Sequence, residues 1–275
     1  MSTKIAPSTA TSQDFVRSND GTEIAFDRRG QGPAVILVDG ALCYRGMGPS
    51  GPLAELLAQR FTVFTYDRRG RGASSDTAPY AVEREVEDIE ALLGEAGGTA
   101  FVSGVSSGAA LAVEAANRLS GIEKLALYEA PFIVDDSRST TQDGWTRIGE
   151  AVAADRRSDA VRLFMKMVGV PDVFIALMRL MPVWSKLKAV AHTLPYDGAL
   201  VADNQRGAPL PAGRWSSVTI PSLVMDGGKS PTWMRNANRA LASALPNAEY
   251  RTLEGQTHML SAKVHAQVLV EFFRE

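Results

Sequence analysis

The sequence predicts an α/β protein: a mostly parallel eight-stranded sheet with helices on both faces and a helical cap. Short β-branched runs alternate with segments of helical periodicity along most of the 275 residues. This alternation breaks once, between residues 133 and 214, where apolar helical segments follow one another without a convincing strand. A composition of 45% hydrophobic and 22% charged residues is that of a globular protein.

Eight short runs rich in apolar and β-branched residues are the predicted strands. The first two form a hairpin that turns at Asn19-Asp20-Gly21. The eight runs cover residues 15–17, 23–27, 34–38, 62–66, 100–104, 125–128, 222–225 and 250–253.

Between the strands, apolar residues recur at the spacing of one helix face. In the clearest case, the apolar residues are Val82, Val86, Ile89 and Leu93. This segment is therefore predicted to be an amphipathic helix that packs on the sheet. Similar helices are predicted at residues 52–59, 109–118, 231–245 and 261–273.

The chain divides into a tail, a core and an insertion. Residues 1–12 are rich in Ser, Thr and Ala, and we expect a flexible tail without a secretory signal. The core comprises residues 13–132 and 215–275. Residues 133–214 are the predicted cap, because helices inserted after a strand lie over the carboxyl edge of the sheet, where open α/β folds bind ligands.

Charge and cysteine content exclude several classes of protein. Lys and Arg total 29 against 31 acidic residues, and the cluster Arg68-Arg69-Gly70-Arg71 is too short to neutralise a nucleic-acid backbone. No apolar run reaches the roughly 20 residues that cross a bilayer. The single cysteine, Cys43, excludes an intrachain disulfide and fits a reducing compartment. We expect a cytoplasmic protein without nucleic-acid or membrane partners, and its oligomeric state stays open.

A Gly-x-Ser-x-Gly motif, Gly104-Val105-Ser106-Ser107-Gly108, lies between a predicted strand and an Ala-rich helix. At such a sharp turn the serine backbone is strained and its hydroxyl is exposed, while the glycines let strand and helix approach each other. Ser106 is therefore the predicted nucleophile. The alternative is an ordinary glycine-rich turn with a surface serine.

A serine nucleophile needs a base, and histidine is the side chain whose pKa suits that task near neutral pH. The chain has three histidines. His258 follows the last predicted strand, which places it at the same sheet edge as Ser106, so it is the predicted base. His265 lies within a predicted helix and His192 in the cap, where packing or solvent-exposed roles are expected.

Four segments in this order and context resemble the α/β-hydrolase superfamily in its cap-bearing, esterase-like form. They are Val38-Asp39-Gly40-Ala41, Asp67-Arg68-Arg69-Gly70-Arg71-Gly72-Ala73-Ser74, the Ser106 motif and Gly255-Gln256-Thr257-His258. The resemblance implies an α/β-hydrolase fold and an oxyanion hole formed by the backbone N–H groups of Ala41 and Ser107. Where the family commonly has His-Gly, this chain has Asp39-Gly40, which places a carboxylate near that hole.

The acid that orients the histidine departs from the usual family position. Most members carry it a few residues beyond a glycine after the strand that precedes the histidine strand, and here that position holds Lys229 or Ser230. Glu129 ends an earlier strand, where some members carry their acid, and it is the predicted acid. Asp226 is the alternative acid, and a dyad without an acid, or another acid, also stays open.

Together these residues predict a serine hydrolase, a carboxylesterase or lactonase, that cleaves an ester-like bond of a mainly apolar small molecule through an acyl-enzyme. The predicted pocket residues are Leu42, Phe132, Trp145 and Trp233. No cofactor or metal is expected, and Cys43 is expected to be a buried apolar side chain. Two alternatives stay open: a carbon–carbon bond hydrolase on the same triad, and a non-catalytic small-molecule binder on this fold.

Overall fold

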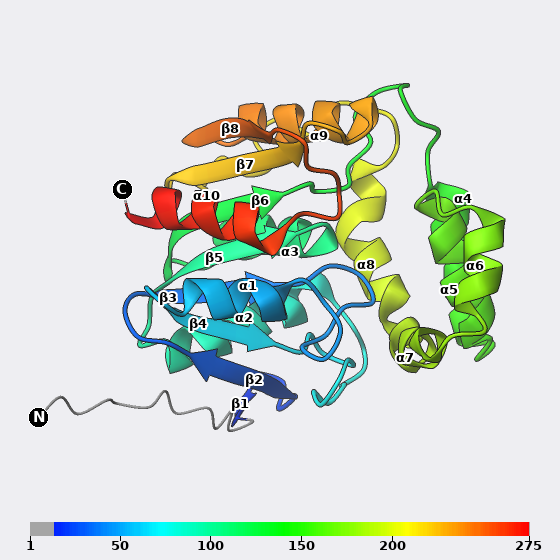
Figure 1. The fold of residues 1–275 in the computed structure, drawn as a ribbon, viewed down its shortest axis with the longest axis horizontal. Helices are drawn as coiled ribbons and strands as arrows, with labels where there is room; N and C mark the ends of the chain where they lie inside the picture. Colours follow the sequence, from blue (N-terminus) through cyan, green and yellow to red (C-terminus); the bar gives the residue numbers. More distant parts are fainter. Residues whose placement is uncertain (1–13, 275) are drawn as a thin grey trace, which may run out of the picture.

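The computed structural model describes residues 14–274, so the predicted tail at residues 1–12 lies outside the described residues. Its strands are β1 (Asp14–Arg17), β2 (Glu23–Arg29), β3 (Ala34–Val38), β4 (Thr62–Tyr66), β5 (Ala100–Val105), β6 (Ile122–Tyr128), β7 (Ser222–Gly227) and β8 (Ala248–Leu253). They form one sheet in the order β1-β2-β4-β3-β5-β6-β7-β8 (Figure 1). β2 pairs antiparallel with β1 and β4, and all other neighbours are parallel. The predicted fold class is confirmed.

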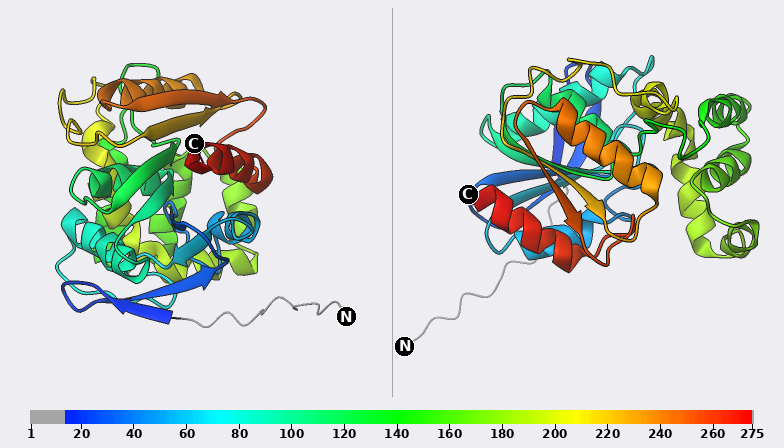
Figure 2. Two further views of the ribbon diagram at one scale, coloured as in Figure 1. Left: turned by 90° about the vertical axis from the view of Figure 1, so that its left-hand side faces the viewer. Right: turned by 90° about the horizontal axis from the view of Figure 1, so that it is seen from above.

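Alternate strand residues build two cores, one on each face of the sheet. On β3, Ile36 and Val38 belong to one core, whereas Val35 and Leu37 belong to the other. The first core is covered by α2 (Val82–Glu95), α3 (Ser107–Ala116) and α9 (Thr232–Ala244), and the second by α1 (Ser50–Leu57) and α10 (Ala262–Arg274). Figure 2 shows these helices on both faces of the sheet.

The chain between β6 and β7 is helical, as predicted. It forms α4 (Gln142–Ala153), α5 (Arg157–Met167), α6 (Asp172–Met178), α7 (Pro182–Val190) and α8 (Leu194–Val201), which lie together at the right of Figure 1. α8 packs on α3 and so connects this segment to the sheet, while α4 to α7 share an apolar core of their own. No helix within residues 14–274 is long and apolar enough to cross a membrane.

Candidate active site

Ser106 lies at the turn between β5 and α3 and has backbone angles of φ 56° and ψ −129°, a strained conformation for a residue other than glycine. The glycines of the motif permit this turn. A Cβ on Gly104 would lie 2.4 Å from the carbonyl oxygen of Gly108, and one on Gly108 would lie 2.3 Å from that of Val38. The motif therefore has the strand-to-helix geometry that its sequence predicts.

Glu129 and His258 are in direct contact. His258 Nδ1 lies 2.7 Å from Oε2 of Glu129. A carboxylate oxygen can only accept, so Nδ1 donates, and in the neutral ring Nε2 is free to accept a proton. The other carboxylate oxygen, Oε1, accepts the backbone N–H of Gly227 at 2.8 Å. Glu129 is fully buried, and both of its oxygens are therefore held in place.

The loop that carries His258 is tied to the ends of β6 and β7. The hydroxyl of Tyr128 donates to the carbonyl oxygen of Thr257 at 2.6 Å. Gly227 packs so closely on the loop that a Cβ there would lie 2.6 Å from the carbonyl oxygen of Gln256. These contacts place the imidazole beside Glu129, although the side chain of His258 remains 44% exposed.

Backbone strain is concentrated around this site. Within residues 14–274, four residues other than glycine have positive φ angles, and three of them are Leu42 at 61°, Ser106 at 56° and Glu129 at 49°. Such angles cost free energy and persist where the surrounding structure enforces them. The strain therefore coincides with the predicted nucleophile, the predicted acid and one predicted pocket residue.

Asp226, the alternative acid, does not face His258. It lies within β7 and is fully buried. Its Oδ2 accepts the hydroxyl of Tyr250 and lies 3.8 Å from Nε of Arg235. The structure thus brings Glu129 to His258 and directs Asp226 toward different partners.

The two predicted oxyanion donors lie close to Ser106. The peptide that joins Gly40 to Ala41 approaches the serine closely, because a Cβ on Gly40 would lie only 2.9 Å from the Cβ of Ser106. Ser107 is the first residue of α3, so its N–H has no acceptor within the helix. Ala41 and Ser107 both line a cavity that Ser106 also lines.

Asp39 and Cys43 lie close to this peptide in the sequence, and neither is arranged as a reactive group. Ser50 donates from Oγ to Oδ1 of Asp39 at 2.6 Å, and burial raises the pKa of this carboxyl to about 6. The carboxylate expected near the oxyanion hole is therefore directed toward the start of α1. Burial and the neighbouring Asp39 raise the pKa of Cys43 to about 12, which keeps the thiol protonated and a poor nucleophile.

Two cavities meet at Ser106 and His258. The larger, of about 660 Å³, is lined mostly by apolar residues, Leu42 among them. The smaller, of about 190 Å³, is lined by Trp145 and Trp233. These three predicted pocket residues therefore line cavities at the candidate nucleophile.

The fourth predicted pocket residue, Phe132, lies elsewhere, and its assignment is corrected. Phe132 lines neither cavity and is 1% exposed. Its ring stacks on that of Trp215, with 6.0 Å between the ring centroids, in the core shared with α3. The chain turns at this point, since the N–H of Phe132 donates to the carbonyl of Ala130 at 2.9 Å, and the turn directs the ring into the core.

No sequence motif marks two polar residues of the smaller cavity, Arg138 and Gln205. The guanidinium of Arg138 lies 4.0 Å over the ring of Trp233 and donates to the carbonyl of Met167. Gln205 accepts the indole N–H of Trp145 at 2.7 Å. Only the fold brings these residues together. Within residues 14–274, no group of three His, Cys, Asp or Glu side chains is arranged to hold a metal ion.

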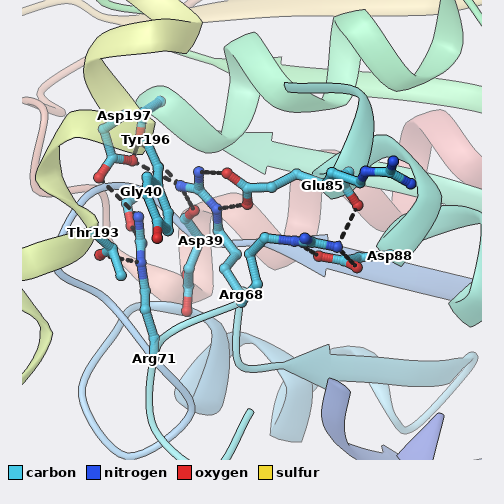
Figure 3. A network of polar contacts seen from close by, with 12 residues as sticks. Asp39, Gly40, Arg68, Arg71, Glu85, Asp88, Thr193, Tyr196 and Asp197 are labelled. Atoms are coloured by element: carbon cyan, nitrogen blue, oxygen red, sulfur yellow. Dashed lines mark hydrogen bonds and ion pairs between the residues drawn. The ribbon is translucent and has the colours of Figure 1, made fainter. Parts of the chain in front are cut away.

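The basic cluster after β4 is buried beside the oxyanion side of the site. Arg68, Arg69 and Arg71 are each at most 1% exposed, so they form no surface patch. Their ion pairs include Arg68–Glu85 at 2.6 Å, Arg68–Asp197 at 2.8 Å, Arg69–Asp88 at 2.7 Å and Arg71–Asp197 at 2.7 Å (Figure 3). Burial acts to raise the pKa of Asp197, but the charges of Arg71 and Arg68 lower it overall. Asp197 is therefore a charged group that lies between two arginines.

Comparison with known proteins places the chain in a family. A model described as "Alpha/beta hydrolase family" matches residues 35–271. The crystal structure of an alpha/beta hydrolase from Sphaerobacter thermophilus DSM 20745 is 52% identical, covers 94% of this chain and 100% of that chain, and has a TM-score of 0.86. An esterase from Exiguobacterium antarcticum is 18% identical with a TM-score of 0.73, covering 96% of this chain and 100% of that chain, which is a likeness of fold.

A curated relative matches a shorter stretch. "Probable oxidoreductase EphD" of Mycobacterium tuberculosis is 36% identical over 98 residues, which is 32% of this chain and 16% of that protein. The chain therefore spans only about one sixth of the length of this relative. The family model, by contrast, covers most of the chain, and the chain belongs to the alpha/beta hydrolase family.

Proposed function

We propose that this protein is a serine hydrolase that cleaves the carboxylic ester or lactone bond of a mainly apolar small molecule through an acyl-enzyme on Ser106. The observation that carries the proposal is the 2.7 Å contact between His258 Nδ1 and the buried carboxylate of Glu129. This contact orients the proposed base, His258, which lines both cavities together with Ser106.

Each residue has one role in the proposed reaction. Ser106 Oγ attacks the carbonyl carbon while Nε2 of His258 takes its proton, and Glu129 stabilises the imidazolium that forms. The N–H groups of Ala41 and Ser107 donate to the oxyanion. The imidazolium then protonates the departing alcohol. In the second half, His258 takes a proton from water, the resulting hydroxide attacks the acyl carbon, and Ser106 leaves with its proton restored.

The two cavities support an ester with unequal halves. The larger cavity offers apolar side chains from the loop after β3, from α5 and from the loop before α10. Burial of an apolar group there is favourable because it removes apolar surface from water. A lactone fits the same scheme, since its leaving alcohol stays attached to the acyl group during the first step.

The acyl-enzyme is tested by partitioning between two nucleophiles. Esters that share one apolar acyl group but carry different alcohols are hydrolysed in water that contains a fixed fraction of methanol. A common acyl-enzyme predicts one ratio of free acid to methyl ester for every alcohol, because the alcohol has left before the partition occurs. A ratio that changes with the alcohol would exclude the intermediate, and no hydrolysis of any ester or lactone would favour a binding protein.

A further inference from the structure

The N–H of Ala41 is fixed through the other end of its own peptide group. The carbonyl of Gly40 and the N–H of Ala41 belong to one planar trans peptide, so they point in opposite directions. Arg71 Nη1 donates to the carbonyl oxygen of Gly40 at 2.7 Å, and the N–H of Cys43 donates to the same oxygen at 3.3 Å. A contact that fixes the direction of this carbonyl therefore also fixes the direction of the Ala41 N–H.

The second donor, the N–H of Ser107, is held through its own side chain. Ser107 Oγ donates to Oδ1 of Asp197 at 2.7 Å. The other oxygen of the same carboxylate, Oδ2, accepts Nη2 of Arg71 at 2.7 Å (Figure 3). Asp197 lies on α8 and is fully buried. Asp197 thus binds Arg71, which holds the peptide of Ala41, and it also binds the side chain of Ser107.

We infer that Asp197 is a positioning residue for the oxyanion hole, acting through Arg71 on Ala41 and through Ser107 on its own N–H. This inference rests on the proposed serine-hydrolase function. Oxyanion donors stabilise the transition state only when they are aimed at the developing charge before the reaction begins. Because Asp197 comes from α8, the hole is fully ordered only when α8 is packed on the core.

A pair of substrates tests this role. In a thionoester, sulfur replaces the carbonyl oxygen, and sulfur is the weaker hydrogen-bond acceptor, so an ordered hole favours the oxygen ester. The ratio of kcat/KM for the ester to kcat/KM for its thionoester is measured in the wild type and in Asp197→Asn. Tyr196→Phe is the matched control, since Tyr196 is on the same helix and its hydroxyl donates to Asp76 rather than to the hole.

The inference predicts that Asp197→Asn lowers the ester-to-thionoester ratio by about 10- to 100-fold, mostly through kcat, whereas Tyr196→Phe leaves the ratio unchanged. Ser107→Ala keeps the backbone N–H but loses its anchor, and a smaller fall is expected. Equal losses for both substrates in Asp197→Asn would show a merely structural role and overturn the inference. Should Asp197→Asn not fold, an unchanged ratio in Ser107→Ala would overturn it. A wild type that cleaves neither substrate would overturn the proposed function itself.

The smaller cavity contains an arginine, Arg138. Arg138 lines the smaller cavity with Ser106 and His258, and no ion pair within residues 14–274 includes it. Its guanidinium lies 4.0 Å over the ring of Trp233, and one N–H donates to the carbonyl of Met167. An arginine carries five N–H groups, so four remain for a ligand or solvent.

We propose that Arg138 binds a carboxylate on the substrate, and this second proposal also rests on the serine-hydrolase function. The contacts with Trp233 and Met167 hold the guanidinium in the cavity, and its fork of N–H groups matches the two oxygens of a carboxylate. The smaller cavity of about 190 Å³ includes Ser106, so the carboxylate belongs to a short group joined directly to the scissile ester. The substrate class is then an ester with one apolar half and one small anionic half.

Two esters of the same apolar acid test this proposal, one with glycolate as its alcohol half and one with glycolamide. The shapes match and only the charge differs. Arg138→Gln should lower the carboxylate-to-carboxamide ratio of kcat/KM by about 10- to 100-fold, the value of a charge-assisted hydrogen bond. Arg235→Gln, which alters an arginine near Asp226, is the control. An unchanged ratio in Arg138→Gln would show that Arg138 does not bind the carboxylate. A wild type that hydrolyses neither ester would instead overturn the proposed serine-hydrolase function.

Discussion

Two fully buried carboxylates, Glu129 and Asp197, serve the proposed site around Ser106, and their surroundings differ. Glu129 contacts an imidazole and one backbone N–H, and its ion-pair partner is His258, which can gain or lose a proton. Asp197 instead lies between two guanidinium groups, those of Arg68 and Arg71. In the proposed mechanism, the carboxylate that responds to proton transfer contacts an imidazole, whereas the carboxylate that fixes geometry is paired with two arginines.

Loss of the nucleophile should have the largest effect, because both sides of the site act on it. Ser106→Ala is expected to lower kcat/KM for esters by at least about 10⁴-fold, with an unchanged thermal unfolding midpoint. Ser103→Ala is the matched control, since Ser103 lies three residues earlier, within β5. Ester hydrolysis by Ser106→Ala at the wild-type rate would show that Ser106 is not the nucleophile.

The next effect separates the acid of the catalytic side from the other buried carboxylate nearby. Glu129→Gln should lower kcat by about 10²- to 10⁴-fold, because an amide cannot stabilise the imidazolium and can select the wrong tautomer. Asp226→Asn is expected to change kcat by less than about threefold, since Asp226 binds Tyr250 rather than His258. Steady-state kinetics on one ester check both variants. A larger loss in Asp226→Asn would reassign the acid.

On the oxyanion side, Asp39 makes stability depend on pH. Burial raises its pKa from 3.8 to about 6, so as the pH rises between these values the unfolded chain releases the proton while the folded chain keeps it. The contribution of this carboxyl to folding therefore falls with rising pH, by about 2–3 kcal/mol at 1.36 kcal/mol per pKa unit. The free energy of unfolding of Asp39→Asn, relative to the wild type, should rise by that amount between pH 4 and pH 7. Urea titrations that give a pH-independent difference would contradict this.

The smallest effect concerns the loop that carries His258. Tyr128→Phe removes the hydroxyl that donates to Thr257, and we expect a loss of about 1 kcal/mol in the free energy of unfolding. The fall in kcat should stay below about tenfold, because Glu129 still holds the imidazole. A fall as large as that of Glu129→Gln would show that the loop anchor, and not the carboxylate, orients the base.

Much of the acid–base side could be predicted from the sequence because its residues follow strands. Ser106 has a motif, His258 follows the last strand, and Glu129 directly follows β6, which lies beside β5. Parallel strands bring such positions to one edge of the sheet, so chain position alone indicates proximity.

The oxyanion side could not be predicted in the same way. Asp197 pairs with Arg71 although the two are 126 residues apart in the sequence. No periodic pattern in the sequence indicates which acidic residue pairs with a buried arginine. Phe132 shows a second limit. An aromatic residue shortly after a strand can face either the cavity or the core, and here a turn at Ala130 directs the ring onto Trp215.

Reaction with a fluorophosphonate is the sharpest test of Ser106 as the nucleophile, because the reagent reacts far faster with a serine that is activated by a base and faces an oxyanion hole than with an ordinary hydroxyl. Peptide mass spectrometry should find the adduct on Ser106, absent in Ser106→Ala and formed much more slowly in Glu129→Gln than in Asp226→Asn. An unmodified Ser106, or an adduct confined to Ser107 or Cys43, would exclude Ser106 as the nucleophile.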